Sequence, residues 1–389
     1  MKNTKEKVRD WWVSYGKLWT KRIFEYLFLA VLFSFVGAVL FVYFDLAQTD
    51  ADSARYMLSA LVQSQAAIVA IVISLTLIAV QLSASAYSPR VIRIFRNNPD
   101  VWLLLGLYGM SIFYGLLILK TIRDGDLSKI SLFNYPIETH IISAYFLGIF
   151  SFLMLFRYIL SIIDLLNPTN IINRLKIDIT KDKILNSKED PIQPIVDIVH
   201  GSIMKYDIET TRVGLKAVTE RVIEIIDSDK EKEISKRFCE HLARVSRLAI
   251  SKEDEDSTVE VIKCLAKFGI STTEKELKVA ISKVTESLGG VGVDAVKKGL
   301  EFATSEALKD LGKVGIAAAE NKLEDATTQV VVSLEEVGKS AAKKKLEDAT
   351  WEAVKFLGEV GGATAKQDFK DATSRAVSSL VVVGKSAAE

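Results

Sequence analysis

The amino-acid sequence predicts an all-α fold in two parts, a four-helix transmembrane domain followed by a cytosolic α-solenoid of 23-residue helical repeats. Uncharged apolar stretches, each near the roughly 20 residues that a helix needs to cross a bilayer, are concentrated before Asp164. Beyond that residue, short motifs recur at a constant interval. The 50 basic and 49 acidic residues almost cancel, so no overall charge attracts the chain to nucleic acid.

Residues 1–22 are expected to form an amphipathic helix in the membrane interface. Apolar and aromatic side chains recur there at helical spacing: Val8, Trp11, Trp12, Tyr15, Trp19 and Ile23. Lysine and arginine residues occupy the other side, an arrangement typical of helices whose aromatic face lies at headgroup level. A simple anchor is the commoner role of such a segment, and a lipid or tension sensor is the alternative.

Residues 23–165 are expected to form the transmembrane domain, with spans at about residues 24–45, 56–88, 101–120 and 139–163. The length of the first apolar run, and the spans that follow it, exclude a cleaved signal peptide. Cytosolic loops carry excess lysine and arginine, and such an excess occurs before the first span and again at Arg90, Arg93 and Arg96. We therefore expect a multi-pass protein of the plasma membrane, surrounded by the lipid bilayer, with both termini in the cytosol.

Small and weakly polar residues line one side of the second predicted span. At or beside a seven-residue spacing they are Gln63, Ala67, Ser74, Gln81 and Ser88. Small residues let helix backbones approach closely in lipid, and the same residues would also suit the wall of an aqueous pore. Helix packing is the more frequent use, and both interpretations stay open.

Charge within the apolar runs is rare, and Arg157 is the clearest case. An ionisable side chain inside a span is costly, which makes it a candidate functional group. Arg157 is near the expected cytosolic end of the fourth span, so its long side chain can also reach the interface. The element Ser88-Pro89-Arg90 predicts a turn at the membrane surface, because proline disfavours helix in the preceding residue and the arginine faces lipid phosphates.

A family resemblance covers about residues 11–164. It rests on the run Gln81-Leu-Ser-Ala-Ser-Ala-Tyr-Ser-Pro-Arg90, then on Leu105-Gly106 and on Phe113-Tyr114 through Leu119-Lys120. These residues resemble a family of prokaryotic membrane proteins whose second span ends in a similar Ser-Pro-Arg element. The resemblance implies a four-span membrane domain and no particular activity. Members of that family usually continue with a Ser-Pro-x-x-Asn-Asp-Pro motif, which this sequence lacks.

The second half consists of units of 23 residues. Leu323-Glu-Asp-Ala-Thr327 recurs as Leu346-Glu-Asp-Ala-Thr350 and, with changes, as Phe369-Lys-Asp-Ala-Thr373. One glycine per unit keeps the same register: Gly269, Gly292, Gly315, Gly338, Gly361 and Gly384. Because glycine commonly stops a helix, each unit is expected to be a helix that ends at this glycine, followed by a short helix or tight turn. Residues 231–389 would then stack as a solenoid, since no single unit buries its apolar face alone.

A single long coiled coil is the competing fold for this half. A period of 23 is a multiple of neither seven nor eleven, and one glycine per unit would cost about 1 kcal/mol in a helix interior, so the stacked array is favoured. Between the two halves, residues 166–230 are expected to form a helical coupling segment. The last unit contains Val381, Val382 and Val383, which we expect to meet another subunit or a partner protein.

The sequence contains no recognisable catalytic or cofactor motif. The histidines are scattered at His140, His200 and His241, so no metal site is expected. Cys239 and Cys264 are expected to remain free thiols in the cytosol. We therefore expect neither an enzyme nor a nucleic-acid-binding protein, and no cofactor.

Two functions remain open. The first is a membrane-anchored scaffold, whose repeat domain binds a cytosolic protein or assembles the chain as a homo-oligomer. The second is a homo-oligomeric ion channel, lined by the second span and gated by the solenoid. The scaffold is preferred because the sequence shows neither pore charges nor a filter motif.

Overall fold

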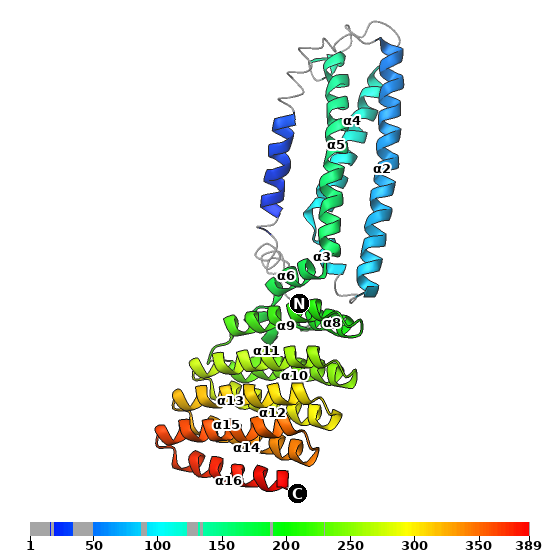
Figure 1. The fold of residues 1–389 in the computed structure, drawn as a ribbon. Coiled ribbons are helices and arrows are strands. Elements are labelled where there is room, and N and C mark those ends of the chain that lie inside the picture. Colours follow the sequence, from blue (N-terminus) through cyan, green and yellow to red (C-terminus); the bar gives the residue numbers. More distant parts are fainter. Residues whose placement is uncertain are drawn as a thin grey trace. The chain divides into compact units, whose positions relative to one another are not determined.

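A computed structural model describes residues 16, 19–33, 50–86, 92–122, 131–132, 135–186, 190–228 and 230–388. The chain divides into two compact units, Met1–Asn170 and Ile171–Glu389. Apart from one small hairpin, the described elements of both units are helices (Figure 1). The all-α class is therefore confirmed.

The first unit contains three long helices, two shorter helical segments and the hairpin. Residues 19–33 are helical, and they are followed by α2 (Ala51–Ala86), α3 (Ile92–Arg96), α4 (Pro99–Thr121), β1 (Ser131–Leu132), β2 (Tyr135–Pro136) and α5 (Ile137–Leu166). The two strands pair antiparallel, with Ser131 opposite Pro136. Helix α6 (Pro168–Asp178) begins in this unit and continues into the second.

Three of the described helices are long and apolar enough to cross a membrane, over Ala51–Ser85, Pro99–Thr121 and Ile137–Leu166. They correspond to the second, third and fourth predicted spans. Of the first predicted span, residues 24–33 are helical and the remainder lies outside the described residues, so four spans stay a prediction. Large apolar side chains on these helices point outward, including Ile71, Phe113 and Leu160, as expected of surfaces that contact lipid.

Two glycines allow α2 to pack closely against its neighbours. A Cβ added at Gly115 of α4 would lie 2.7 Å from a methyl group of Val62, and one added at Gly148 of α5 would lie 2.8 Å from Leu61. A side chain at either position would push α2 away. Because lipid is as apolar as the helices, the hydrophobic effect does not drive their association, and close packing at small residues of this kind stabilises it instead.

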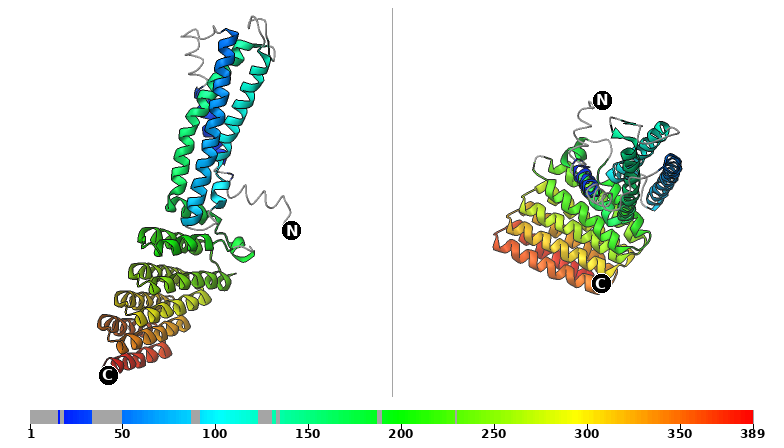
Figure 2. Two further views of the ribbon diagram at one scale, coloured as in Figure 1. Left: turned by 90° about the vertical axis from the view of Figure 1, so that its right-hand side faces the viewer. Right: turned by 90° about the horizontal axis from the view of Figure 1, so that it is seen from above.

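The second unit is a stack of helices. After α6 it contains α7 (Lys181–Asn186), α8 (Gln193–Ile203), α9 (Ile208–Ile225), α10 (Glu231–Ser251), α11 (Glu255–Glu274), α12 (Lys278–Lys298), α13 (Glu301–Glu320), α14 (Glu324–Lys343), α15 (Glu347–Lys366) and α16 (Lys370–Ala388). From α10 onward each helix packs against the next one and against the next but one. Helices α11, α13 and α15 therefore form one layer, and α10, α12, α14 and α16 form the other (Figures 1 and 2). This segmented stack is a helical-repeat array and not a single coiled coil.

Each 23-residue unit is one helix and one turn, and the helix does not end at the glycine, which corrects the expected helix end. The repeat glycine does not end the helix, because Gly338 lies inside α14. The chain reverses direction after that helix, where Lys345 adopts a φ of 58°. There the N–H of Leu346 donates to the carbonyl of Ala341, and the N–H of Lys345 donates to the carbonyl of Ala342. These are the two hydrogen bonds of a Schellman motif.

A residue with positive φ recurs in every turn of the array: Glu253, Glu276, Gly299, Lys322, Lys345 and Asp368. Successive members are 23 residues apart, so the turns keep the period of the repeat. Glycine adopts this left-handed conformation without strain, yet it stands at one of these six positions only. For that reason the helix ends carry no regular glycine signal in the sequence.

The repeat glycines serve helix packing. A Cβ added at Gly315 would lie 2.8 Å from Val330 of α14 and 3.0 Å from Val360 of α15. These neighbours are 15 and 45 residues further along the chain, and the same two separations describe the contacts of Gly269, Gly292 and Gly338. Gly361 keeps the first contact, and Gly384 in the last helix has neither. The first four glycines thus mark the points where a helix approaches both the next helix and the next but one.

The helix starts are linked along a layer. The Glu255 carboxylate of α11 accepts a hydrogen bond from the N–H of Ala303 at the start of α13, over 3.0 Å. The Glu301 carboxylate of α13 accepts one from the N–H of Asp348 at the start of α15, over 3.1 Å. The first N–H groups of a helix have no partner within it, and a carboxylate at that end is also favoured by the helix dipole. These bonds hold the glutamate side chains in place.

Candidate functional site

The predicted seam of the second span lies on the outer side of α2 within this chain. Gln63, Ala67, Ser74 and Gln81 are exposed. The side of α2 that packs inward is offset by two residues, at Leu58, Gln65, Val72 and Ala79. Ser88 lies outside the described residues, as do Pro89 and Arg90, so the interfacial turn stays a prediction. Within the described residues, the seam does not pack α2 against α4 or α5. Its contact with lipid or with a second copy of the chain stays a prediction.

The inward side of α2 carries polar contacts that the sequence did not reveal. Gln65 Nε2 donates a hydrogen bond to Ser111 Oγ of α4 over 2.9 Å, and both side chains are buried. Thr76 shares a hydrogen bond with the Tyr158 hydroxyl of α5. These two contacts join α2 to each of its neighbours. The inward residues repeat every seven positions, like the seam, so the period alone cannot select the buried face.

A cluster of charged side chains joins the helical segment 19–33 to α4 and α5. Arg157 of α5 forms an ion pair with Glu25, so the predicted intramembrane charge is paired within the chain. The Arg22 guanidinium lies 3.1 Å from Glu25 and 3.6 Å from Asp100. Asp100 is fully buried and accepts a hydrogen bond from Ser161 of α5. Paired charges of this kind reduce the cost of placing ionised groups in apolar surroundings.

The third predicted span begins at about residue 101, which leaves Asp100 just outside it. The structure places it in the first turn of α4, which starts with Pro99 and has Asn98 as its N-cap. The helix start therefore directs this carboxylate into the bundle. Because the two arginines and two carboxylates of the cluster contact one another, we interpret the cluster as a structural tie between helices.

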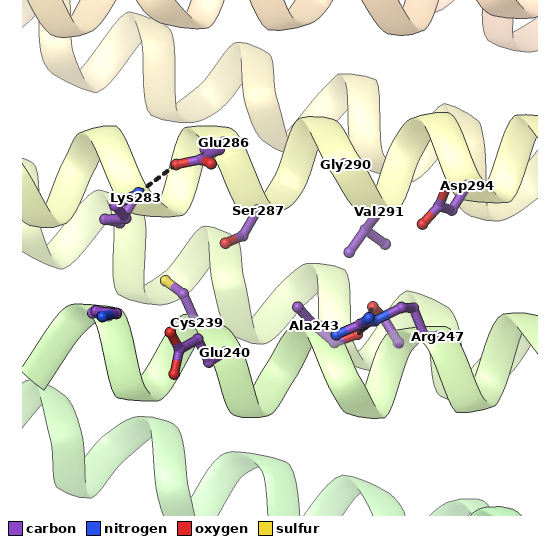
Figure 3. A pocket seen from close by; sticks show the side chains of 12 residues that line it. Cys239, Glu240, Ala243, Arg247, Lys283, Glu286, Ser287, Gly290, Val291 and Asp294 are labelled. Carbon is purple, nitrogen blue, oxygen red and sulfur yellow. Dashed lines mark hydrogen bonds and ion pairs between the residues drawn. The ribbon is translucent and has the colours of Figure 1, made fainter.

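Cavities open on the surface of the array between helices of the same layer. One of about 340 Å³ lies between α10 and α12, and side chains of both charge signs line it, including Glu240, Arg247, Lys283 and Asp294 (Figure 3). The Lys283 ammonium lies 2.7 Å from Glu286, the ion pair drawn in Figure 3. A second cavity, of about 580 Å³, is lined mainly by residues of α11 and α13. A third, of about 570 Å³, lies at the N-terminal turns of α11, α13 and α15.

The cysteines are poor candidates for nucleophiles. Cys239 lines the cavity of Figure 3, and burial raises the pKa of its thiol to about 12. Burial also raises the pKa of the Cys264 thiol to about 11. A thiol reacts as its thiolate, so both groups are inert near neutral pH. Among the described residues, no three His, Cys, Asp or Glu side chains gather as ligands for a metal ion.

The buried His241 holds the start of the array. Arg244 donates a hydrogen bond to Nδ1 of His241 over 2.8 Å, so the ring proton is on Nε2, which donates to Asp190 over 2.6 Å. Burial acts to raise the pKa of Asp190, but its hydrogen bonds, above all the one from His241, hold it below the usual range. Burial lowers the pKa of His200 on α8. Both contacts of His241 are internal, as expected of a structural histidine.

Residues 17–239 match a family model described as a predicted membrane protein (DUF2254), and the match covers more than half of the chain. The chain belongs to this family. The resemblance expected from the Ser-Pro-Arg run is thereby confirmed, and the match extends beyond the expected end near residue 164, through α9 into α10. The remaining residues of this DUF2254 protein, 240–389, form most of the helical-repeat array.

No curated protein matches this DUF2254 chain. One similar solved structure is a circular tandem repeat protein with novel repeat topology and enhanced subunit contact surfaces. The two chains are 13% identical, the match covers 87% of this chain and 88% of the other, and the TM-score is 0.38. At that score the likeness carries no statement about the function of the array.

Proposed function

We propose that this DUF2254 protein is a membrane-anchored scaffold, whose cytosolic helical repeats bind a partner protein or assemble copies of the chain. The observation that carries the proposal is the series of cavities between helices of the same layer, all lined by charged side chains and one of them also by aromatic rings. Stacked helical repeats use extended surfaces of this kind to bind proteins and peptides. The membrane-length helices would hold such a surface at the bilayer.

The chemistry of the described side chains supports binding over catalysis. The Cys239 thiol stays protonated at neutral pH, and both ring nitrogens of His241 are occupied by Arg244 and Asp190. In the membrane unit, Arg157 pairs with Glu25. These candidate reactive or transporting groups thus serve the fold, and we propose no enzymatic activity.

Photo-crosslinking of the full-length protein in living cells tests the proposal. A photoreactive amino acid replaces Arg247 or Asp294, which line the cavity between α10 and α12. The control position is Phe113, which points outward from α4. The array positions are expected to give adducts with one or a few defined proteins, or with a differently tagged copy of this chain. If they give no protein adduct while position 113 labels lipid, the scaffold is refuted.

A homo-oligomeric channel is the alternative that the seam on α2 suggests. Its residues Gln63, Ser74 and Gln81 face outward, where they would contact lipid in a single chain and another chain in a pore. The family match does not support conduction. The scaffold is therefore the function we propose.

A further inference from the structure

Two aromatic residues depart from the pattern of the repeat. Residues 323–328 have the sequence Leu-Glu-Asp-Ala-Thr-Thr. At the third position, α13 has Phe302 in place of Asp325, and at the sixth position, α15 has Trp351 in place of Thr328. Since the α14 unit folds with small polar residues at both positions, the architecture of the repeat requires neither ring.

Both rings are exposed at the same cavity. Phe302 is 59% exposed and Trp351 is 68% exposed, so neither contributes much to the core. They line the cavity of about 570 Å³ at the N-terminal turns of α11, α13 and α15. Two separate departures from the repeat thus converge on one hollow, although they are in different helices. Exposed aromatic side chains beside a hollow are typical of binding surfaces.

The remaining lining of this cavity is acidic. Carboxylates surround the two rings: Glu255, Glu301, Asp348 and Glu352. Glu255 and Glu301 are held in place by the hydrogen bonds that they accept from backbone N–H groups of α13 and α15. The Lys355 ammonium lies 3.6 Å from Glu352, and no lysine or arginine of the described chain lines the cavity itself. Its charge is therefore strongly negative.

Two buried oxygen atoms in the lining lack a hydrogen-bond partner within the described chain. They are Ser305 Oγ and Glu352 Oε2, and the second of these is the oxygen that lies 3.6 Å from the Lys355 ammonium. Buried polar atoms normally find a hydrogen-bond partner, so the Ser305 hydroxyl can accept a bond from a group that enters the cavity, and Glu352 can accept one beside its ion pair. Guanidinium and ammonium groups carry several donors, pair with carboxylates and lie favourably over aromatic rings.

We propose that this cavity binds an arginine- or lysine-bearing segment of a partner protein. The cationic head lies among the four carboxylates, and its planar face or aliphatic stem lies on Phe302 and Trp351. The same carboxylates repel nucleic acids and anionic lipid headgroups, which leaves a protein segment as the ligand that fits. This inference rests on the proposed scaffold function and specifies the chemistry of its partner.

Fluorescence anisotropy tests the proposal, with the full-length protein in a neutral detergent and a labelled peptide that alternates arginine with serine. Trp351→Thr gives α15 the residue type that α14 has at this position, so the variant is expected to fold. It should bind the peptide about ten-fold more weakly, as expected for loss of a partly desolvated cation–π contact. Glu352→Gln should weaken binding to a similar extent, and added salt should weaken the binding of every form.

Val377→Ser provides the matched control, because it removes an exposed apolar side chain from α16, away from the cavity. Its affinity for the peptide should equal that of the wild type. Equal binding by the wild type and Trp351→Thr would overturn the proposal, as would tighter binding of the same peptide with glutamate in place of arginine.

Competition with an unlabelled peptide of residues 1–22 tests whether this chain's own basic segment occupies the cavity. If it displaces the arginine peptide at lower concentration than unlabelled arginine peptide does, the site belongs to this chain's own basic segment and the partner proposed here is wrong. Failure of the inference leaves the protein adducts from the cavity between α10 and α12 unaffected. The crosslinking experiment therefore decides the scaffold function separately.

Discussion

Replacement of Gly338 by alanine should destabilise the array, although alanine is the better helix former. At an open helical position, the change from glycine to alanine stabilises by about 1 kcal/mol. At Gly338 the new Cβ would lie 2.6 Å from the Cβ of Ala353, which cannot rotate away because it is fixed to its backbone. Helices α14 and α15 must move apart, and overpacking of this kind typically costs about 1–3 kcal/mol. After the gain in helix propensity is subtracted, we expect a net loss of up to about 2 kcal/mol in the free energy of unfolding.

Gly362 provides the control for this substitution. It is inside α15, and a Cβ there would meet nothing within 4 Å, so Gly362→Ala should stabilise by up to about 1 kcal/mol. The assay is hydrogen exchange of the α14 and α15 amides in the full-length protein at increasing urea, which reports the opening of these helices. If the free energy of opening falls in Gly338→Ala and rises in Gly362→Ala, the packing role of the repeat glycine is supported. If Gly338→Ala protects the amides as well as Gly362→Ala does, the reasoning is refuted.

Three further predictions concern pH, the turns and conduction. Burial lowers the pKa of His200 below its usual 6.5, so the unfolded chain takes up the proton first and the stability of the fold decreases as the pH drops below 6.5. His200→Gln should make the urea midpoint of unfolding depend less steeply on pH in this range. An unchanged pH dependence contradicts the assignment. Lys345→Gly should raise the stability of the array by about 1 kcal/mol in the same measurement, because lysine is strained at a φ of 58° and glycine is not. In planar bilayers we expect neither the wild type nor Gln81→Leu to conduct an ionic current. A current that is present in the wild type and absent in Gln81→Leu would favour the channel.

The sequence predicted the membrane-length helices and the repeat period well, because both are long-range patterns of hydropathy and spacing. It misplaced the helix ends within each unit. A glycine in register can stop a helix or let two helices touch, and Gly338 does the second. The true end, Lys343-Lys344-Lys345, consists of good helix formers, so tertiary packing and not local propensity sets the turn.

The candidate sites were harder to predict than the fold. The seam at Ala67 and Ser74 was visible, but the face of α2 that packs inward depends on neighbours that a single helix does not specify. Asp100 precedes the third predicted span, and its burial could not be predicted because it follows from the capped start of α4. Phe302 and Trp351 were not singled out, although alignment of the repeats exposes both as exceptions, since only the fold shows that they share a cavity.

The alternation of helices between two layers limits how this array can lengthen without losing its surface. Insertion of a single 23-residue unit between α13 and α15 would send Trp351 to the opposite layer from Phe302 and dismantle the shared hollow. Insertion of two units would keep both rings in one layer but separate them by an additional helix. Growth beyond either end spares them altogether, so duplication at the termini is the route by which such a protein can gain length and keep what it already binds.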